Sequence, residues 1–332
     1  MRAMMSTRTG GAETLQMLEV TTPDPGPGEV RIAVHAAGVN FPDTIIIRDL
    51  YQYKPQRPFA PGGEVSGLVD ALGDGVTGFA LGDRVLGLPL FGGFSSHVNM
   101  AAHMVRKIPD AMPFDEAACF VFTYGTSYYA LQDRASLAAG ETLLVLGAAG
   151  GIGASAVELG KAMGARVIAA VSSQEKAAFC RDLGADEVLI YPREMDRAAQ
   201  KVFGAAIKAV APDGVDVVYD PVGGDYAEPS LRAIAWNGRY LVVGFPAGIP
   251  SIPLNLPLLK NCQIVGVFWG AFTAREPERH GAQMDALFAM YKAGKIRPRI
   301  SQVMPLEDAA EALRMIEERR AKGKIVLQVS AG

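Results

Sequence analysis

One segment near the middle of the chain constrains its fold more than any other. Thr142-Leu-Leu-Val-Leu is a continuous apolar run, four glycines follow within 147–153, and 152–163 has helical spacing. Such a run is typical of a strand covered on both faces, as in a parallel sheet. Glycines between strand and helix allow a tight turn and close approach of a pyrophosphate to backbone N–H groups. We therefore predict a dinucleotide-binding loop, although the glycine spacing departs from strict G-x-G-x-x-G.

The alternation of strands and helices continues after this loop. Strands are predicted at 166–171, 187–190, 215–219, 239–243 and 263–268, and helices at 174–183, 196–210 and 225–235. Parallel strands joined by helices form a right-handed doubly wound sheet. Residues 122–292 are therefore expected to form a Rossmann-type nucleotide-binding domain.

The two ends of the chain differ from this middle part. Residues 30–35 alternate as a half-buried strand does, and glycines recur among Val and Leu from 62 to 82, which favours a barrel of short twisted strands. After residue 293, a helix at 306–320 and a strand at 324–329 do not extend the series. We expect a tail that returns to complete the first domain, giving 1–121 with 293–332.

Composition excludes several classes of function. The 332 residues carry 32 Lys and Arg against 35 Asp and Glu, a net charge of −3, so no polybasic surface for nucleic acid or anionic lipid is expected. No stretch resembles a signal peptide or a membrane span. Three widely separated cysteines argue against a disulfide framework or a cysteine metal cluster. The expectation is a cytoplasmic globular protein.

The turn after the second predicted strand bears on the choice of nucleotide. An NAD site places an acidic residue there to bind the ribose hydroxyls. In this chain Val171 is followed by Ser172, and Lys176 lies one turn further on, which favours the 2′-phosphate of NADPH. Ser172 as a helix cap and Lys176 as a solvated surface charge remain open alternatives, and Glu175 lies nearby.

Taken together, the motifs resemble the medium-chain dehydrogenase/reductase superfamily, in particular its zinc-free quinone oxidoreductase branch, which includes zeta-crystallin. The resemblance runs nearly end to end. It rests on the glycine loop and on Gly38-Val-Asn-Phe-Pro-Asp, Pro61-Gly-Gly-Glu, Gly82-Asp-Arg-Val, Thr126-Ser-Tyr-Tyr-Ala-Leu, Asp220-Pro-Val-Gly-Gly, Gly238-Arg-Tyr-Leu-Val-Val-Gly and Gly323-Lys-Ile-Val-Leu. The resemblance implies an α/β protein with a GroES-like β-barrel catalytic domain and an inserted Rossmann domain.

The resemblance also identifies the positions at which zinc-dependent relatives bind their catalytic metal. The positions that hold catalytic zinc in zinc-dependent relatives correspond to Asn40, Gly63-Glu64 and Phe122. Glu64 alone cannot provide the three or four ligands that zinc needs, so we expect no metal site. Without a Lewis acid, alcohol oxidation is disfavoured, and hydride transfer from NADPH to a quinone or conjugated enone is expected.

The resemblance assigns roles to individual residues. Asn40 and Thr126 would flank the nicotinamide, with Asn40 orienting its amide or donating to a substrate oxygen, and Tyr51 would supply a hydroxyl to the substrate. The remaining cofactor contacts would be Gly150, Gly151 and Ile152 at the pyrophosphate, Ser172, Lys176 and Tyr191 at the 2′-phosphate, and Val222, Gly244, Phe245, Phe268 and Lys324 closing over the cofactor. Asn40 and Thr126 as caps, and the aromatic residues as ordinary core, remain alternatives.

Three hypotheses for function stay open. The first is the NADPH-dependent quinone or enone reductase, acting on a flat conjugated carbonyl compound. The second is an enoyl-thioester reductase, for which Arg275, Arg279, Arg297 and Arg299 would bind the phosphates of CoA. The third is a catalytically weak, NADPH-binding redox sensor. The apolar run 264–270 predicts a homodimer that forms through edge strands of the Rossmann domain.

Overall fold

The computed structural model describes residues 1–330, which separate into two compact units. Met1–Phe122 together with the chain from Pro298 onward forms the first unit, and Thr123–Arg297 forms the second. The sequence places the nucleotide-binding domain at 122–292. The observed second unit starts one residue later and ends five residues later than that range.

The second unit contains a six-stranded parallel sheet in the order β10-β9-β8-β11-β12-β13. Its strands are β8 (Thr142–Leu146), β9 (Arg166–Val171), β10 (Glu187–Ile190), β11 (Val215–Asp220), β12 (Ile234–Val242) and β13 (Gln263–Gly266). The order reverses between β8 and β11, as it does in a Rossmann fold. The predicted doubly wound sheet is therefore confirmed. The strand predicted at 239–243 is the second half of β12, which starts at Ile234.

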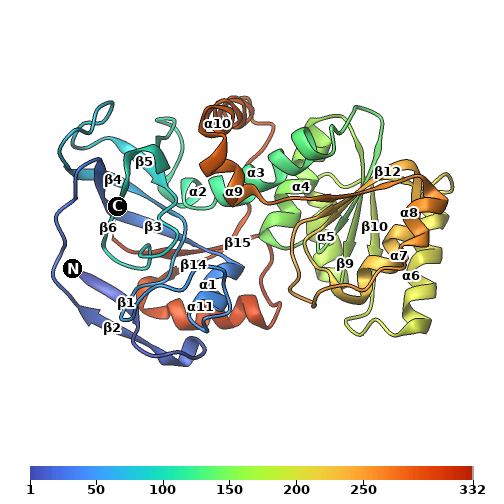
Figure 1. Ribbon diagram of the computed structural model, residues 1–332, viewed down its shortest axis with the longest axis horizontal. Coiled ribbons are helices and arrows are strands. Elements are labelled where there is room, and N and C mark those ends of the chain that lie inside the picture. Colours follow the sequence, from blue (N-terminus) through green and yellow to red (C-terminus); the bar gives the residue numbers. More distant parts are fainter. Residues whose placement is uncertain (331–332) are drawn as a thin grey trace. The chain divides into compact units, whose positions relative to one another are not determined.

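Helices cover both faces of this sheet, with α4 and α5 on one side and α6 and α7 on the other (Figure 1). They are α4 (Gly151–Ala162), α5 (Gln174–Asp182), α6 (Arg197–Val210), α7 (Ala227–Arg232), α8 (Asn255–Lys260), α9 (Trp269–Arg275) and α10 (Pro277–Lys292). Before them, α3 (Val121–Tyr128) continues into a π-helical turn, η3 (Tyr129–Arg134). No helix within residues 1–330 has the length and apolar character needed to cross a membrane.

The first unit is built on a seven-stranded, largely antiparallel sheet and a separate two-stranded sheet. Its strands are β1 (Arg2–Ser6), β2 (Leu15–Glu19), β3 (Glu29–Val39), β4 (Val65–Leu72), β5 (Arg84–Gly87), β6 (His97–Ala101), β7 (Val105–Lys107), β14 (Ile300–Pro305) and β15 (Lys324–Gln328). Three helices accompany them: α1 (Phe41–Ile46), α2 (Phe114–Ala117) and α11 (Ala309–Glu317). Alternate residues of β3 are buried, as the period-2 pattern predicts.

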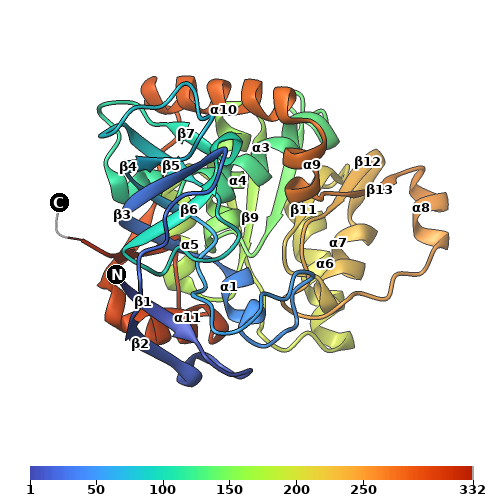
Figure 2. The same cartoon turned by 60° about the vertical axis from the view of Figure 1, so that its left-hand side comes forward.

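The tail of the chain completes this first sheet. Strand β15 pairs with β3 in antiparallel register, which places Ile325 opposite Val39 and Leu327 opposite Ala37, and β14 pairs with β15. Figure 2 shows α11 lying next to α1 on the same unit. The predicted return of the tail is confirmed. Its consequence for the site is that Lys324, the first residue of β15, lies beside the end of β3.

Candidate functional site

The glycine loop after β8 forms the start of α4. Gly147 adopts a positive φ of 59°, and Gly150 is the residue that precedes the helix. A Cβ atom on Gly153 would lie 2.3 Å from the carbonyl oxygen of Gly147, so only glycine allows this close packing. The expected pyrophosphate residues Gly150, Gly151 and Ile152 therefore stand at the beginning of a twelve-residue helix. The arrangement fits a dinucleotide pyrophosphate, because helix N-termini present N–H groups and a positive dipole to anions.

The turn after β9 shows which serine caps the next helix. Ser173, rather than Ser172, caps α5, and its hydroxyl accepts a hydrogen bond from the Lys176 N–H at 3.3 Å. The alternative interpretation of Ser172 as the cap is therefore wrong. Ser172 and Lys176 are both half-buried at the carboxyl end of β9.

Tyr191 belongs to the same edge of the sheet. Its N–H donates to the carbonyl of Val171 at 2.9 Å, so the chain leaving β10 runs next to Ser172. Its ring is buried and packs against Phe203 and Tyr226, at centroid separations of 5.5 and 4.8 Å. The ring of Tyr191 is thus part of the hydrophobic core, which was the alternative to direct cofactor contact.

The loops after β11 and β12 are joined to each other. Asp220 accepts hydrogen bonds from the N–H groups of Val222 and Gly223, both at 2.8 Å, and from the Tyr240 hydroxyl. Ala247 donates its N–H to the Val222 carbonyl at 2.9 Å. Burial raises the pKa of Asp220, an effect that these donors oppose. The carboxylate therefore fixes the shape of the loop that carries Val222.

Four other expected cofactor residues lie in the second unit, one of them in α3. Gly244 lies just after β12 and donates its N–H to the Asp220 carbonyl at 3.3 Å. Phe245 and Phe268 are 44% and 61% exposed, so the interpretation of these two rings as ordinary core is wrong. Thr126 is buried within α3, and its interpretation as a helix cap is also wrong.

In the first unit, the ammonium of Lys324 is the centre of a buried polar network. It donates to Asn40 Oδ1 at 2.6 Å, to the Val39 carbonyl at 3.1 Å and to Glu64 Oε2 at 3.2 Å. Lys324 is 5% exposed and Glu64 is fully buried. Since an ammonium has three N–H bonds, all the donors of Lys324 are used within this unit. A direct contact between Lys324 and a cofactor would require one of them to be given up.

The side chain of Asn40 is held between a cation and an anion. Its Nδ2 donates to Glu64 Oε2 at 3.1 Å and to the Gly38 carbonyl at 3.3 Å, while its Oδ1 faces Lys324. Glu64 also accepts the backbone N–H of Phe122 at 2.8 Å, through Oε1. An ammonium can only donate and an ionised carboxylate can only accept, so one orientation of the Asn40 amide satisfies both neighbours.

Asp43 and Tyr51 lie near this network. Asp43 accepts the backbone N–H groups of Asn40 and Gly62, at 2.8 and 3.2 Å, so its carboxyl is bound by the backbone. Burial raises the pKa of Asp43 to about 6, although these N–H groups and Lys324 act in the opposite direction. Burial and the charge of Asp43 also raise the pKa of the half-buried Tyr51. The Tyr51 hydroxyl therefore keeps its proton at neutral pH and can donate it.

The same positions were considered above for zinc, and they do not fit that metal. Asn40 and Glu64 both contact the Lys324 ammonium, and Phe122 contributes only its backbone N–H. One carboxylate and one amide beside a cation do not form a three- or four-ligand zinc site. Within residues 1–330, no three His, Cys, Asp or Glu side chains lie together as metal ligands.

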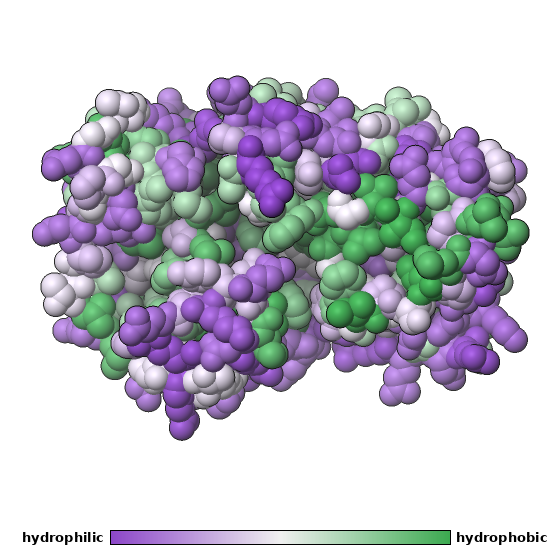
Figure 3. Space-filling view, in the orientation of Figure 1, coloured by the Kyte–Doolittle hydropathy of each residue, from purple (hydrophilic) through white to green (hydrophobic). Residues whose placement is uncertain are grey.

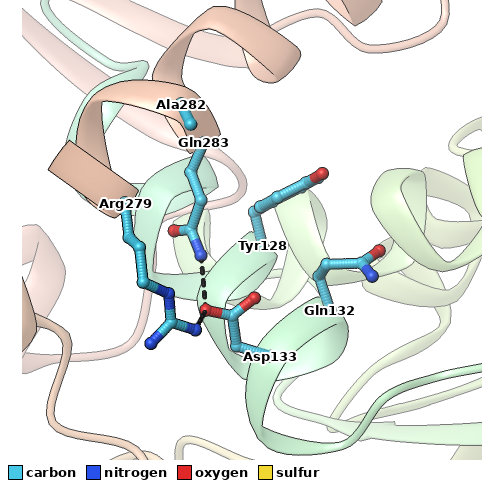
Figure 4. A pocket seen from close by; sticks show the side chains of 6 residues that line it. All are labelled: Tyr128, Gln132, Asp133, Arg279, Ala282 and Gln283. Atoms are coloured by element: carbon cyan, nitrogen blue, oxygen red, sulfur yellow. Dashed lines mark hydrogen bonds and ion pairs between the residues drawn. The ribbon is translucent and has the colours of Figure 1, made fainter.

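A separate polar pocket of about 340 Å³ lies in the second unit. Figure 4 shows Asp133 accepting from Arg279 and from Gln283, both at 2.8 Å. Arg279 also forms an ion pair with Glu276. Arg279 was expected to bind CoA phosphates in the second hypothesis. In the structure its guanidinium is held between two carboxylates.

Sequence reasoning missed the partners of the expected residues. Glu64 and Lys324 each appeared in a motif, but nothing in the sequence indicated that both contact Asn40. The link of Asp220 to Tyr240 was missed in the same way. The sequence did contain one signal, which is the presence of charged residues within apolar motifs. Such residues are expected to be buried, and a buried charge needs a partner. That signal shows that a partner exists without identifying it.

Comparison with known proteins adds independent information. Residues 26–110 match the family described as alcohol dehydrogenase GroES-like domain, and residues 183–327 match the family described as zinc-binding dehydrogenase. The quinone oxidoreductase-like protein 2 homolog of Nematostella vectensis is 38% identical over 313 residues, which cover 92% of this chain and 83% of that protein.

Two solved structures extend the comparison. Escherichia coli quinone oxidoreductase complexed with NADPH superposes with a TM-score of 0.89 at 30% identity, over 99% of this chain and all of that one. The CurK enoyl reductase superposes with a TM-score of 0.87 at 26% identity, over 99% of both chains.

The raised pKa of Asp43 leads to a prediction about stability. The pKa of this carboxyl is about 6 in the folded state and ordinary in the unfolded state, so the folded state binds more protons between about pH 4 and 6. The contribution of Asp43 to the free energy of unfolding therefore falls as pH rises through this range, by about 3 kcal/mol in total. Urea unfolding of wild type and Asp43→Asn from pH 4 to 7 measures it. The difference between the two curves should change with pH, and parallel curves would contradict the assignment.

Proposed function

The chain belongs to the quinone oxidoreductase-like branch of the medium-chain dehydrogenase/reductase superfamily, and from this premise we propose that it is an NADPH-dependent, zinc-independent reductase of quinones and conjugated enones. The observation that carries the proposal is the buried Asn40, Glu64 and Lys324 network. It places an ammonium among the residues that correspond to zinc ligands in metal-dependent relatives.

The second unit supplies the proposed cofactor site. Gly150, Gly151 and Ile152 would hold the pyrophosphate at the start of α4, where glycine packing permits close approach. Ser172 and Lys176 would bind the 2′-phosphate, since Ser172 is not required as a cap. The other proposed contacts are Thr126, Val222, Gly244, Phe245 and Phe268. The complex of E. coli quinone oxidoreductase with NADPH supports this choice of nucleotide.

The proposed chemistry needs little from the protein beyond positioning. NADPH supplies a hydride from C4 of its nicotinamide when it is bound. Without a metal, the acceptor must already be polarised by conjugation, which favours quinones and enones over simple alcohols. Tyr51 would donate a hydrogen bond to the developing oxyanion, because its raised pKa keeps the hydroxyl protonated. Asn40 would contact the nicotinamide as part of the same site.

An enoyl-thioester reductase is the second candidate, and the similarity to the CurK enoyl reductase favours it. CoA or a carrier-protein arm would need basic residues for its phosphates. Arg279 is already bound by Asp133 and Glu276, which weakens the expected basic groove. We therefore rank this candidate below the quinone or enone reductase.

We also propose that the protein is a homodimer formed through β13. This strand is at one end of the six-stranded sheet, so its outer edge has no partner strand within residues 1–330. Figure 3 shows hydrophobic side chains on the visible face of the second unit. The exposed apolar residues in β13 and in the segment 249–259 before it are Ile249, Leu254, Leu258, Leu259 and Ile264, which are 41% to 83% exposed. An unpaired apolar edge of this kind favours pairing with a second copy.

Cofactor preference tests the assignment of the turn after β9. Ser172→Asp places a carboxylate against the proposed 2′-phosphate and should weaken NADPH binding about tenfold, or about 1.4 kcal/mol, while sparing NADH. Lys176→Ala should weaken NADPH selectively. Titration of both nucleotides against wild type and the variants measures this. Equal affinity of the wild type for NADH and NADPH would show that the turn does not select the phosphate.

A turnover screen tests the function itself. We expect NADPH oxidation with simple quinones and conjugated enones, no oxidation of simple alcohols, and full activity after treatment with EDTA. Enoyl-CoA thioesters belong in the same screen, with identification of products. A strong preference for the thioesters would establish the second candidate instead. Tight NADPH binding without turnover would favour the sensor, and about one zinc per chain with EDTA-sensitive activity would overturn zinc independence.

The dimer prediction has a control within the same sheet. Ile264→Lys, on β13, should shift the mass measured by light scattering from dimer to monomer, because it places a charge at the proposed interface. Ile190→Lys is the matched control, since Ile190 lies on the opposite edge strand and is similarly exposed, 44% against 41%. A monomeric wild type, or dissociation by both variants, would rule out an interface at β13.

A further inference from the structure

Two helices of the second unit, α3 and α4, are joined by buried hydroxyl groups. The Ser127 hydroxyl of α3 lies 2.9 Å from the Ser155 hydroxyl of α4 and 3.1 Å from the Ile152 carbonyl oxygen, also of α4. The Ser155 hydroxyl lies 3.1 Å from the Thr123 carbonyl oxygen of α3. Ser127 is fully buried and Ser155 is 1% exposed. The hydrogen-bonding groups of the two helices therefore face each other in both directions.

Tyr219, near the carboxyl end of β11, determines the direction of these hydrogen bonds. Its side chain is fully buried, and within residues 1–330 its hydroxyl has one hydrogen-bond partner, Ser127, at 2.8 Å. Burial raises the pKa of Tyr219, so the phenol keeps its proton. A buried hydroxyl proton needs an acceptor, so Tyr219 donates to Ser127. The proton of Ser127 is then directed at α4, to Ser155 or to the Ile152 carbonyl.

The opposite face of α3 is held by a different kind of contact. Helical spacing places Gly125 on the side of α3 away from Ser127. A Cβ atom at Gly125 would lie 2.6 Å from the ring of Trp269, so this ring packs directly on the helix backbone. Apolar contacts are not directional, whereas hydrogen bonds are. The hydroxyl groups, together with a hydrogen bond from Tyr124 to Glu158 one turn earlier, therefore determine the position of α3 along α4.

We propose that Ser127 and Ser155 are positioning residues that hold α3 in register with the first turn of α4. The inference rests on the proposed function, in which Thr126 contacts the nicotinamide and Ile152 the pyrophosphate. These two parts of one cofactor are then bound by two helices whose relative position the hydroxyl groups determine. Buried polar groups specify register in helix pairs, at a cost in stability. A displacement of about 1 Å is enough to spoil such an alignment.

The test compares NADPH with 2′-phospho-ADP-ribose, which has the same pyrophosphate and 2′-phosphate but no nicotinamide. Dissociation constants of both are measured by calorimetry, so that no turnover is needed. Wild type should bind NADPH about tenfold more tightly than 2′-phospho-ADP-ribose, a difference of about 1.4 kcal/mol. This ratio of dissociation constants reports how well the protein holds the nicotinamide while the rest of the cofactor stays in place.

The main variant is Ser127→Ala/Ser155→Ala/Tyr219→Phe. It removes all three hydroxyl groups together, so no buried donor is left without an acceptor and the cost in stability is small. The ratio should fall to about twofold or less, while the affinity for 2′-phospho-ADP-ribose stays within about twofold of wild type. If this variant does not fold, Ser155→Ala leaves Tyr219 its acceptor and should lower the ratio to about threefold.

Two control variants separate register from the loss of a buried hydroxyl group. Tyr219→Phe leaves Ser127 able to donate to α4, so its ratio should stay at about tenfold. Ser230→Ala removes another fully buried hydroxyl group of the second unit, one that donates to the Tyr226 carbonyl at 2.8 Å. It should also keep the wild-type ratio. Circular dichroism checks that each variant is folded.

The outcomes separate the inference from the function. A tenfold ratio that survives in the main variant, or an equal loss of affinity for both ligands, overturns the positioning role of Ser127 and Ser155. A wild-type ratio near one also overturns it, although NADPH binding itself would stand. Failure of wild type to bind NADPH would overturn the proposed function.

Discussion

The buried ammonium of Lys324 is the interaction on which the polar interior of the first unit depends. It connects Asn40 and Glu64, which lie 284 and 260 residues away in the sequence. The contact exists because β15 pairs with β3 and brings the last strand next to the end of an early one. Removing one partner from such a group leaves a buried charge uncompensated, so the three residues act as one structural element.

This element also determines which chemistry the first unit can support. The carboxylate of Glu64 is neutralised by an ammonium and by a backbone N–H, and Asn40 has no hydrogen left to donate. Near this element, the protonated hydroxyl of Tyr51 is the group that can still donate a hydrogen bond. The second unit contributes mainly backbone groups, at the start of α4 and in the loop shaped by Asp220. These groups support the proposed reaction, in which the protein mainly positions a cofactor and an acceptor that is already polarised by conjugation.

Much of the second unit was predictable because its signals are local. Strands β9 and β10 have the bounds expected from their apolar runs, since the period and the flanking turns both lie within a few residues. The failures were also local: Ser172 and Ser173 are both good caps, and the sequence does not distinguish them. The Lys324 contacts were beyond prediction for a different reason. They depend on the register between two strands from opposite ends of the chain, which no local pattern encodes.

The central claim is that Lys324 and Glu64 hold the amide of Asn40 in one orientation. Neutron diffraction from crystals of the deuterated protein tests it most directly, because it locates individual deuterons. The account predicts both deuterons of Asn40 Nδ2 directed at Glu64 and the Gly38 carbonyl. A reversed amide, with a deuteron of Nδ2 directed at Lys324 and Oδ1 directed at Glu64, would contradict it.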